Sequence, residues 1–210
     1  LPRRVMTAGY FTAAGGVVTN SVAAYDPPTG TWSAIGTASP TTVTCLGAAP
    51  NGDLFAATSR QVMRWNGATW SNVGGQVDTS IRALGVDATG QIVAGGNFTY
   101  VGGLYLPDIV RWNGTAWATP GSGVNGSVSE LHRMPNGDLV VCGGFDFAGG
   151  IPSYRVAYWT GTSWVPFPGG LAPGGGTILA SDASGAFIPG DSTWGLDQEG
   201  LVEIDDLDAA

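Results

Sequence analysis

A short motif carrying two aromatic residues recurs along the chain, and it constrains the fold more than any other feature. Its clearest copies run from Arg64 to Trp70, from Arg111 to Trp117 and from Tyr158 to Trp164. A longer, earlier copy spans Tyr25 to Trp32. Repeats of this kind mean a modular architecture in which each unit packs only against its neighbours. The repeat therefore predicts the fold, although it does not identify a biochemical activity.

Each repeat contains four short segments with the composition of β-strands. In one unit, residues 43–48, 53–57 and 61–65 are rich in Val, Leu, Ala and aromatic residues, and Gly, Pro, Asn or Ser bounds them. They are too short for ordinary helices. Asn51-Gly52 separates the first two segments, and Gly suits a tight hairpin that requires positive φ. We expect an all-β chain of four-stranded antiparallel units without helices.

Four-stranded units at this period are typical of a β-propeller, in which the sheets stand radially as blades around a channel. The chain holds about five blades' worth of sequence, of which three are complete and two are partial. The predicted units of this single domain are 1–36, 41–75, 79–123, 127–170 and 175–206. Such a chain either closes a distorted five-bladed ring or forms an open arc of a larger propeller. An open arc would expose a blade face and tend to self-associate.

The order of an apolar strand ending in Gly-Gly, a loop, a strand ending in Tyr or Trp, a turn and a second Trp resembles the kelch motif. Tyr25-Asp26-Pro27 with Thr29 and Trp32 is the most similar copy. The later Trp-Asn-Gly copies resemble kelch-like repeats of large secreted or surface-anchored proteins. The resemblance implies a propeller fold. It does not identify a function, because propellers of this kind serve as enzymes, lectins and protein-binding platforms.

Charge and composition exclude some classes of function. The chain has 16 acidic and eight basic residues, a net charge of −8, and all its basic residues are Arg. No basic stripe interleaves with aromatic residues, so we expect no nucleic-acid partner. Gly and Pro interrupt every apolar run, so we expect no membrane span. The resemblance favours a secreted or cell-surface location.

The sequence contains no recognisable catalytic or metal-binding constellation. Its single histidine, His132, has no marked nucleophile beside it, and we interpret it as a structural or surface residue. Cys45 and Cys142 lack the spacing of a zinc site and are expected to be separate buried thiols. We therefore predict no catalytic residues, no metal and no cofactor.

The loops of the expected propeller are uneven, and this asymmetry locates the candidate binding surface. The first-to-second and third-to-fourth turns are minimal and share one face, whereas the longer connections open on the other. Binding residues concentrate on loops held by a rigid scaffold. The repeated Trp residues and Phe98 are expected to pack between blades instead. The candidate ligand-binding residues on the long-loop face are Tyr10, Tyr100, Tyr105 and Tyr154.

Three functions remain open at this point. The first is a non-catalytic binding module of a secreted or surface protein, which presents the long-loop face to a glycan or a protein. The second is a structural repeat segment that has no ligand of its own. The third is a hydrolase or lyase with its site in the central channel, which would require polar groups to converge there.

Overall fold

The computed structural model describes residues 4–36, 40, 42–167, 178–181 and 187–190, and these residues form strands and turns with no helix. Every strand pairing among them is antiparallel. The predicted all-β fold of four-stranded propeller units is therefore confirmed. The last predicted unit, 175–206, lies largely outside the described residues.

The strands form a series of sheets whose order follows the sequence. The first sheet contains β1 (Val5–Ala8), β4 (Val22–Asp26) and β5 (Thr31–Ala34). The second contains β6 (Cys45–Ala48), β7 (Leu54–Ala57), β8 (Gln61–Trp65) and β9 (Trp70–Gln76). The third contains β10 (Ser80–Val86), β11 (Ile92–Asn97), β14 (Ile109–Trp112) and β15 (Trp117–Ala118). The fourth contains β16 (Val128–Arg133), β17 (Leu139–Gly143), β20 (Val156–Trp159) and β21 (Trp164–Pro166), and β22 (Ile178–Ser181) pairs with β23 (Phe187–Gly190).

Three of the connections between second and third strands, which the sequence predicts only to be long, contain a small hairpin. These hairpins are β2 (Ala13–Ala14) with β3 (Val17–Val18), β12 (Tyr100–Val101) with β13 (Leu104–Tyr105), and β18 (Phe147–Ala148) with β19 (Ile151–Pro152). The connection from β7 to β8 spans only residues 58–60 and has none.

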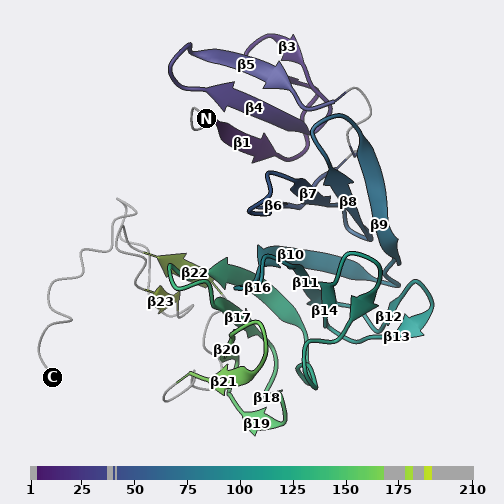
Figure 1. The fold of residues 1–210 in the computed structure, drawn as a ribbon, viewed down its shortest axis with the longest axis vertical. Coiled ribbons are helices and arrows are strands. Elements are labelled where there is room, and N and C mark those ends of the chain that lie inside the picture. The colour runs from purple at the N-terminus through teal and green to yellow at the C-terminus, as the bar shows by residue number, and fades with distance from the viewer. Residues whose placement is uncertain (1–3, 37–39, 41, 168–177, 182–186, 191–210) are drawn as a thin grey trace, which may run out of the picture.

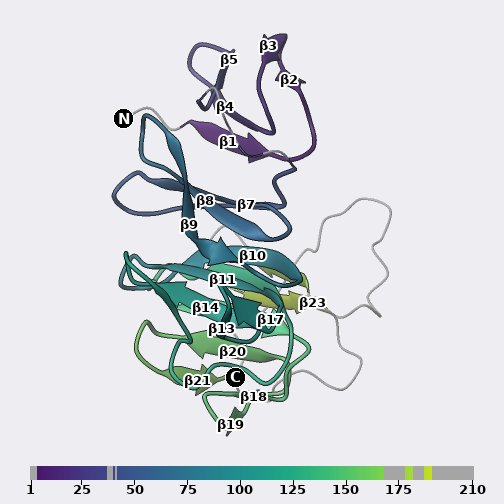
Figure 2. The same cartoon turned by 90° about the vertical axis from the view of Figure 1, so that its right-hand side faces the viewer.

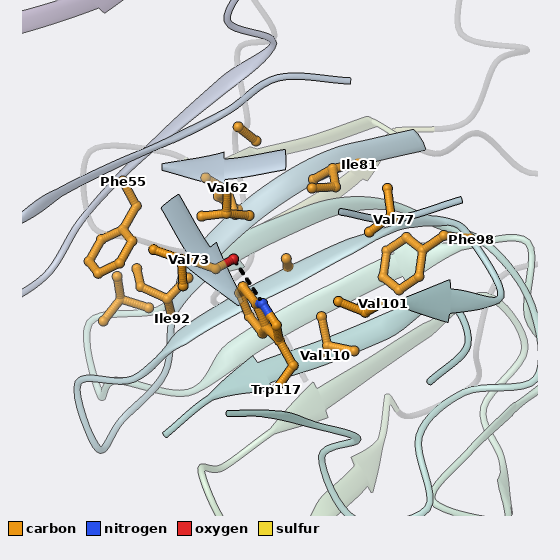
Figure 3. Packing of buried hydrophobic residues seen from close by; sticks show 14 residues of the cluster. Phe55, Val62, Val73, Val77, Ile81, Ile92, Phe98, Val101, Val110 and Trp117 are labelled. Carbon is orange, nitrogen blue, oxygen red and sulfur yellow. Dashed lines mark hydrogen bonds between the residues drawn. The ribbon is translucent and has the colours of Figure 1, made fainter. Parts of the chain in front are cut away.

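The sheets follow one another along an arc (Figure 1). The first strand of each sheet contacts the first strand of the next, so that β6 meets β10, β10 meets β16, and β16 meets β22. Figure 2 shows the sheets stacked face to face along the chain. The buried clusters lie between successive sheets, and the one between the second and third sheets is shown in Figure 3. This is the radial packing of propeller blades.

The repeated aromatic residues are direct cross-strand neighbours. Trp65 pairs with Trp70, Trp112 with Trp117, and Trp159 with Trp164, and their ring centroids lie 5.6, 5.3 and 5.3 Å apart. The turn between each pair is held by one polar side chain. Asn113 Oδ1, for example, accepts hydrogen bonds from the backbone N–H groups of Thr115 and Ala116, each at 2.9 Å. The Trp-Asn-Gly motif is thus a self-capped turn that places two rings side by side.

The second tryptophan of each pair binds the preceding sheet by one repeated hydrogen bond. Trp70 Nε1 donates to the carbonyl oxygen of Ile35 at 2.8 Å, and Trp117 Nε1 donates to that of Val73 at 3.2 Å (Figure 3). Trp164 Nε1 donates in the same way to the carbonyl oxygen of Pro120 at 2.7 Å. A buried indole N–H requires such a partner, so the expected role of these residues in packing between blades is confirmed.

A glycine follows each accepting carbonyl and leaves room for the rings. Gly36, Gly74 and Gly121 all have positive φ angles, of 77°, 66° and 59°. A Cβ atom on Gly36 would lie 2.6 Å from the Trp65 ring, and one on Gly74 would overlap Trp112 and Trp117. Residues with a side chain adopt this backbone conformation at a cost, and here the ring also occupies the space. Each of these three contacts between sheets therefore includes a Trp pair seated on a Gly.

We predict that Gly74→Ala destabilises the protein much more than Gly67→Ala. Both glycines have positive φ, but a Cβ on Gly67 would meet no atom within 4 Å. The backbone strain alone should cost about 1 kcal/mol in Gly67→Ala. Gly74→Ala should cost about 3 kcal/mol, because the methyl group also displaces the Trp117 ring. Denaturant unfolding of the two variants measures the difference, and equal costs would show that the Trp pair is not seated as described.

Candidate binding site

The hairpins between second and third strands provide rigid supports for exposed side chains. Each turns through a Gly-Gly pair with positive φ at both residues, 57° and 85° at Gly102 and Gly103, and 63° and 78° at Gly149 and Gly150. This is the two-residue hairpin geometry that favours glycine. Phe98 and Phe145 precede the hairpins and are 2% and 0% exposed. Phe98 therefore packs inside, as expected, and Phe145 does so at the corresponding position of the fourth sheet.

One acceptor side chain fixes the base of each of the two later hairpins. Asp78 Oδ1 accepts hydrogen bonds from the backbone N–H groups of Thr99 and Tyr100 at 2.8 and 3.1 Å. Those two N–H groups hold the pKa of the Asp78 carboxyl below its ordinary value. Asn125 Oδ1 holds the N–H groups of Asp146 and Phe147 in the corresponding way, at 2.9 and 2.8 Å. The hairpins are thus held to the segments that lead into β10 and β16.

Tyr100 and Tyr105 form a paired aromatic surface on the β12–β13 hairpin. The two residues are register partners, and their ring centroids lie 5.8 Å apart at an interplanar angle of 75°. Tyr100 is 47% exposed and Tyr105 is 68% exposed. An edge-to-face pair of this kind presents both ring area and hydroxyl groups to a ligand at a low cost in side-chain entropy.

The other two candidate tyrosines lie elsewhere on the arc. Tyr10 is the most exposed, at 92%, and precedes the β2–β3 hairpin of the first sheet. Tyr154 follows β19, in the connection between β17 and β20, with a φ of 41°, and it is also exposed. Figures 1 and 2 show these hairpins well separated from β12 and β13. The structure therefore brings together Tyr100 and Tyr105, and it keeps Tyr10 and Tyr154 apart from them.

Sequence reasoning missed several exposed apolar residues on the same hairpins. Leu104 lies beside Tyr105 and is exposed, and Phe147 and Ile151 are exposed on the next hairpin. The signal was present in the Gly-Gly pairs. Gly149-Gly150 follows Gly102-Gly103 at the interval that separates Trp164 from Trp117. A third Gly-Gly at residues 15–16 marks the β2–β3 hairpin, so a Gly-Gly pair stands at each of the three hairpin turns.

An ion pair lies at the other ends of the strands, near the short turns of the third sheet. Asp87 is completely buried, and its Oδ2 accepts hydrogen bonds from Arg111 Nε at 2.5 Å and from Trp159 Nε1 at 3.2 Å. Its Oδ1 accepts from the backbone N–H and the hydroxyl of Thr89 and from the N–H of Gln91. Burial alone would raise the pKa of Asp87, but these hydrogen bonds outweigh burial and hold the pKa below its ordinary value.

The described residues contain no group of three or more His, Cys, Asp or Glu side chains placed to hold a metal ion. His132 lies half-buried on β16 opposite Val140. Cys45 and Cys142 are free thiols, and burial raises the pKa of Cys45 to about 11 and that of Cys142 to about 12. Within the part of the chain that the structure describes, no helix is long and apolar enough to cross a membrane.

Comparisons with known proteins find similarity only among solved structures. No protein-family model matches the chain, and no curated protein matches it. A structure of YCF48 bound to a D1 peptide is 14% identical with a TM-score of 0.46, over 69% of this chain and 46% of that one. A structure of U3-55K is 14% identical with a TM-score of 0.46, over 69% of this chain and 44% of that one. A chain of the mitotic checkpoint complex is 17% identical with a TM-score of 0.43, over 66% of this chain and 41% of that one.

All three identities lie at or below 17%, and all three TM-scores lie below 0.5. The chain spans less than half the length of each of the three. The assignment of the fold to this chain rests on its own sheets, registers and contacts between sheets.

We predict that Asp87→Asn destabilises the protein in a pH-dependent way. Because the folded-state pKa of Asp87 is depressed, its carboxylate stabilises the fold above the unfolded-state pKa of about 4. That contribution is lost as the pH falls through the folded-state value. At pH 7 the substitution should cost about 3 kcal/mol, since it leaves Arg111 beside a neutral group. Chemical unfolding across the acid range should show the difference from the unmodified protein shrinking below pH ~4.

The matched control is Asp53→Asn, which removes the partner of Arg64 in the second sheet. Arg64 Nη2 lies 2.6 Å from Asp53 Oδ2, but the Arg64 side chain is 44% exposed, against 22% for Arg111. Asp53→Asn should lower the free energy of unfolding by less than Asp87→Asn does, because solvent screens the Asp53–Arg64 pair. A cost for Asp87→Asn that is independent of pH would contradict the assignment of Asp87 as a buried carboxylate that stabilises the fold.

Proposed function

We propose that this chain is a non-catalytic interaction module, built of kelch-like repeats, whose β12–β13 hairpin binds a protein partner. The observation that carries the proposal is the pair Tyr100 and Tyr105, exposed together on a backbone that Asp78 holds in place. Two rings fixed before binding lose little freedom when a partner covers them.

The neighbouring side chains favour a protein over a glycan at this hairpin. Leu104 is 62% exposed on the same hairpin and lies beside Tyr105 in the sequence. Tyr residues set among aliphatic neighbours are typical of the energetically dominant centre of a protein interface. A sugar site usually combines ring area with several convergent hydrogen-bonding side chains.

A secreted or cell-surface location is part of this proposal. Its support is the resemblance of the Trp-Asn-Gly units to repeats of secreted and surface-anchored proteins. The main alternative is a structural repeat segment whose hairpins have no partner. The two functions differ in one measurable respect, because only an interaction module loses binding when the hairpin tyrosines are removed.

We predict that Tyr100→Ala and Tyr105→Ala each weaken partner binding without lowering the melting temperature. Quantitative affinity capture from the extracellular fraction of the source organism identifies the partner, and titration with the purified partner gives the affinities. Loss of a dominant interface residue costs about 2 kcal/mol, so each variant should bind about 30-fold more weakly.

Tyr10→Ala is the control, because it removes an even more exposed tyrosine that precedes a separate hairpin. It should bind as the unmodified protein does. The proposal fails if all three variants capture the same proteins in equal amounts, or if Tyr10→Ala loses the partner as well. Capture of no specific protein by the unmodified chain would favour the structural alternative.

A further inference from the structure

A groove of about 430 Å³, lined by both polar and apolar residues, lies between the third and fourth sheets, away from the tyrosine hairpin. Its lining includes Gln91, Arg111, Asn113, Thr119, Trp159 and Thr162. Gln91 is the last residue of the connection from β10 to β11, and Asn113 and Thr162 belong to the turns that precede β15 and β21. These short turns join the ends of strands opposite to the ends that carry the hairpins. The groove is therefore a separate surface from that of Tyr100 and Tyr105.

Arg111, the cationic side chain of the groove, is held in place by hydrogen bonds, and a carboxylate neutralises its charge. The Arg111 guanidinium bonds to Asp87 through Nε and to the Thr89 hydroxyl through Nη2 at 2.6 Å. It also lies 5.9 Å from the centroid of the Trp159 ring. The buried Asp87 carboxylate balances its charge, so the site gains a rigid set of N–H donors without becoming a strongly positive pocket.

Two amide side chains complete the polar lining. Asn113 uses its Oδ1 for the turn, and its Nδ2 donates no hydrogen bond to a described residue. The Oε1 atom of Gln91 is buried and has no hydrogen-bond partner in the described part of the chain. A buried acceptor without a partner is costly, and a bound polar molecule or water relieves that cost. The groove thus combines unused donors with a buried acceptor that has no partner, and the largely buried Trp159 ring forms part of its wall.

We propose that this groove binds a neutral carbohydrate of one or two pyranose rings. Its volume falls in the range of small-molecule sites, which is about 300–1,000 Å³. Hydroxyl groups can both donate to Gln91 and accept from Arg111 and Asn113. Anions are disfavoured, because Asp87 compensates Arg111 and the chain carries a net charge of −8.

A comparison with the second sheet shows which residue difference sets the groove of the third sheet apart. Arg64 and Arg111 occupy the same register position in their sheets, but Asp53 stands where the third sheet has Gln91. In the second sheet the carboxylate is therefore beside the turn and pairs with an exposed Arg64. In the third sheet the carboxylate is at the buried position 87, which leaves a neutral amide at the groove.

The experiment is ligand-detected NMR with a panel of methyl glucoside, methyl galactoside, maltose and cellobiose, and with acetate and phosphate as anionic probes. Ala118 is exposed and lines the groove, so Ala118→Phe fills it. Ser71→Phe is the matched control, because Ser71 lies opposite Arg64 as Ala118 lies opposite Arg111. Gln91→Met removes the side-chain acceptor, whereas the hydrogen bond from the backbone N–H of residue 91 to Asp87 Oδ1 remains.

We expect at least one sugar to bind, Ala118→Phe to abolish the signal, and Ser71→Phe to preserve it. Gln91→Met should weaken binding about fivefold, the effect of one lost hydrogen bond. It also provides the test if Ala118→Phe does not fold. The proposal is overturned if no sugar binds, if acetate or phosphate binds instead, or if sugar binding survives both groove variants. Loss of sugar binding in Tyr100→Ala alone would move the carbohydrate site to the hairpin and overturn this assignment.

Discussion

The hydrogen bond from a tryptophan indole to the backbone of the preceding sheet is the interaction on which the rest of the structure depends. It occurs at Trp70, Trp117 and Trp164, and each time the acceptor is followed by a glycine with positive φ. A carbonyl fixes the position of one ring, and the ring fixes the spacing of two sheets. Because the contact repeats, the sheets follow one another along an arc (Figure 1). The strand ends then lie along two opposite rims that carry different side chains.

The two rims offer different chemistry because the turns that form them differ. Short turns capped by Asn or Thr side chains leave little chain to vary, and there the groove arises from the gap between the third and fourth sheets. On the other rim, inserted hairpins carry side chains away from the sheets. Asp78 and Asn125 hold these hairpins by equivalent hydrogen bonds, so Tyr100 and Phe147 stand on similar supports. One scaffold thus presents an aromatic surface at one rim and a groove with unused hydrogen-bonding groups at the other.

The sequence predicted the fold well because the fold depends on local, repeated signals. The Trp-Asn-Gly turns and the alternation of short apolar segments indicated both the strands and the packing role of Trp117 and Trp164. The hairpins were missed because two-residue strands are too short for a visible hydrophobic period. The groove was beyond prediction for a different reason. It depends on Asp87 and Trp159, which are 72 residues apart in sequence and meet only through packing between sheets.

Hydrogen exchange of the tryptophan indole N–H groups, followed by NMR on the folded protein, tests the central contact most directly. The account predicts slow exchange at Trp70, Trp117 and Trp164, because each N–H is held by a carbonyl of the neighbouring sheet. Trp65 and Trp112 donate to no described residue and should exchange faster. Equally fast exchange at all five positions would show that the sheets are not joined by these bonds, and would contradict the account.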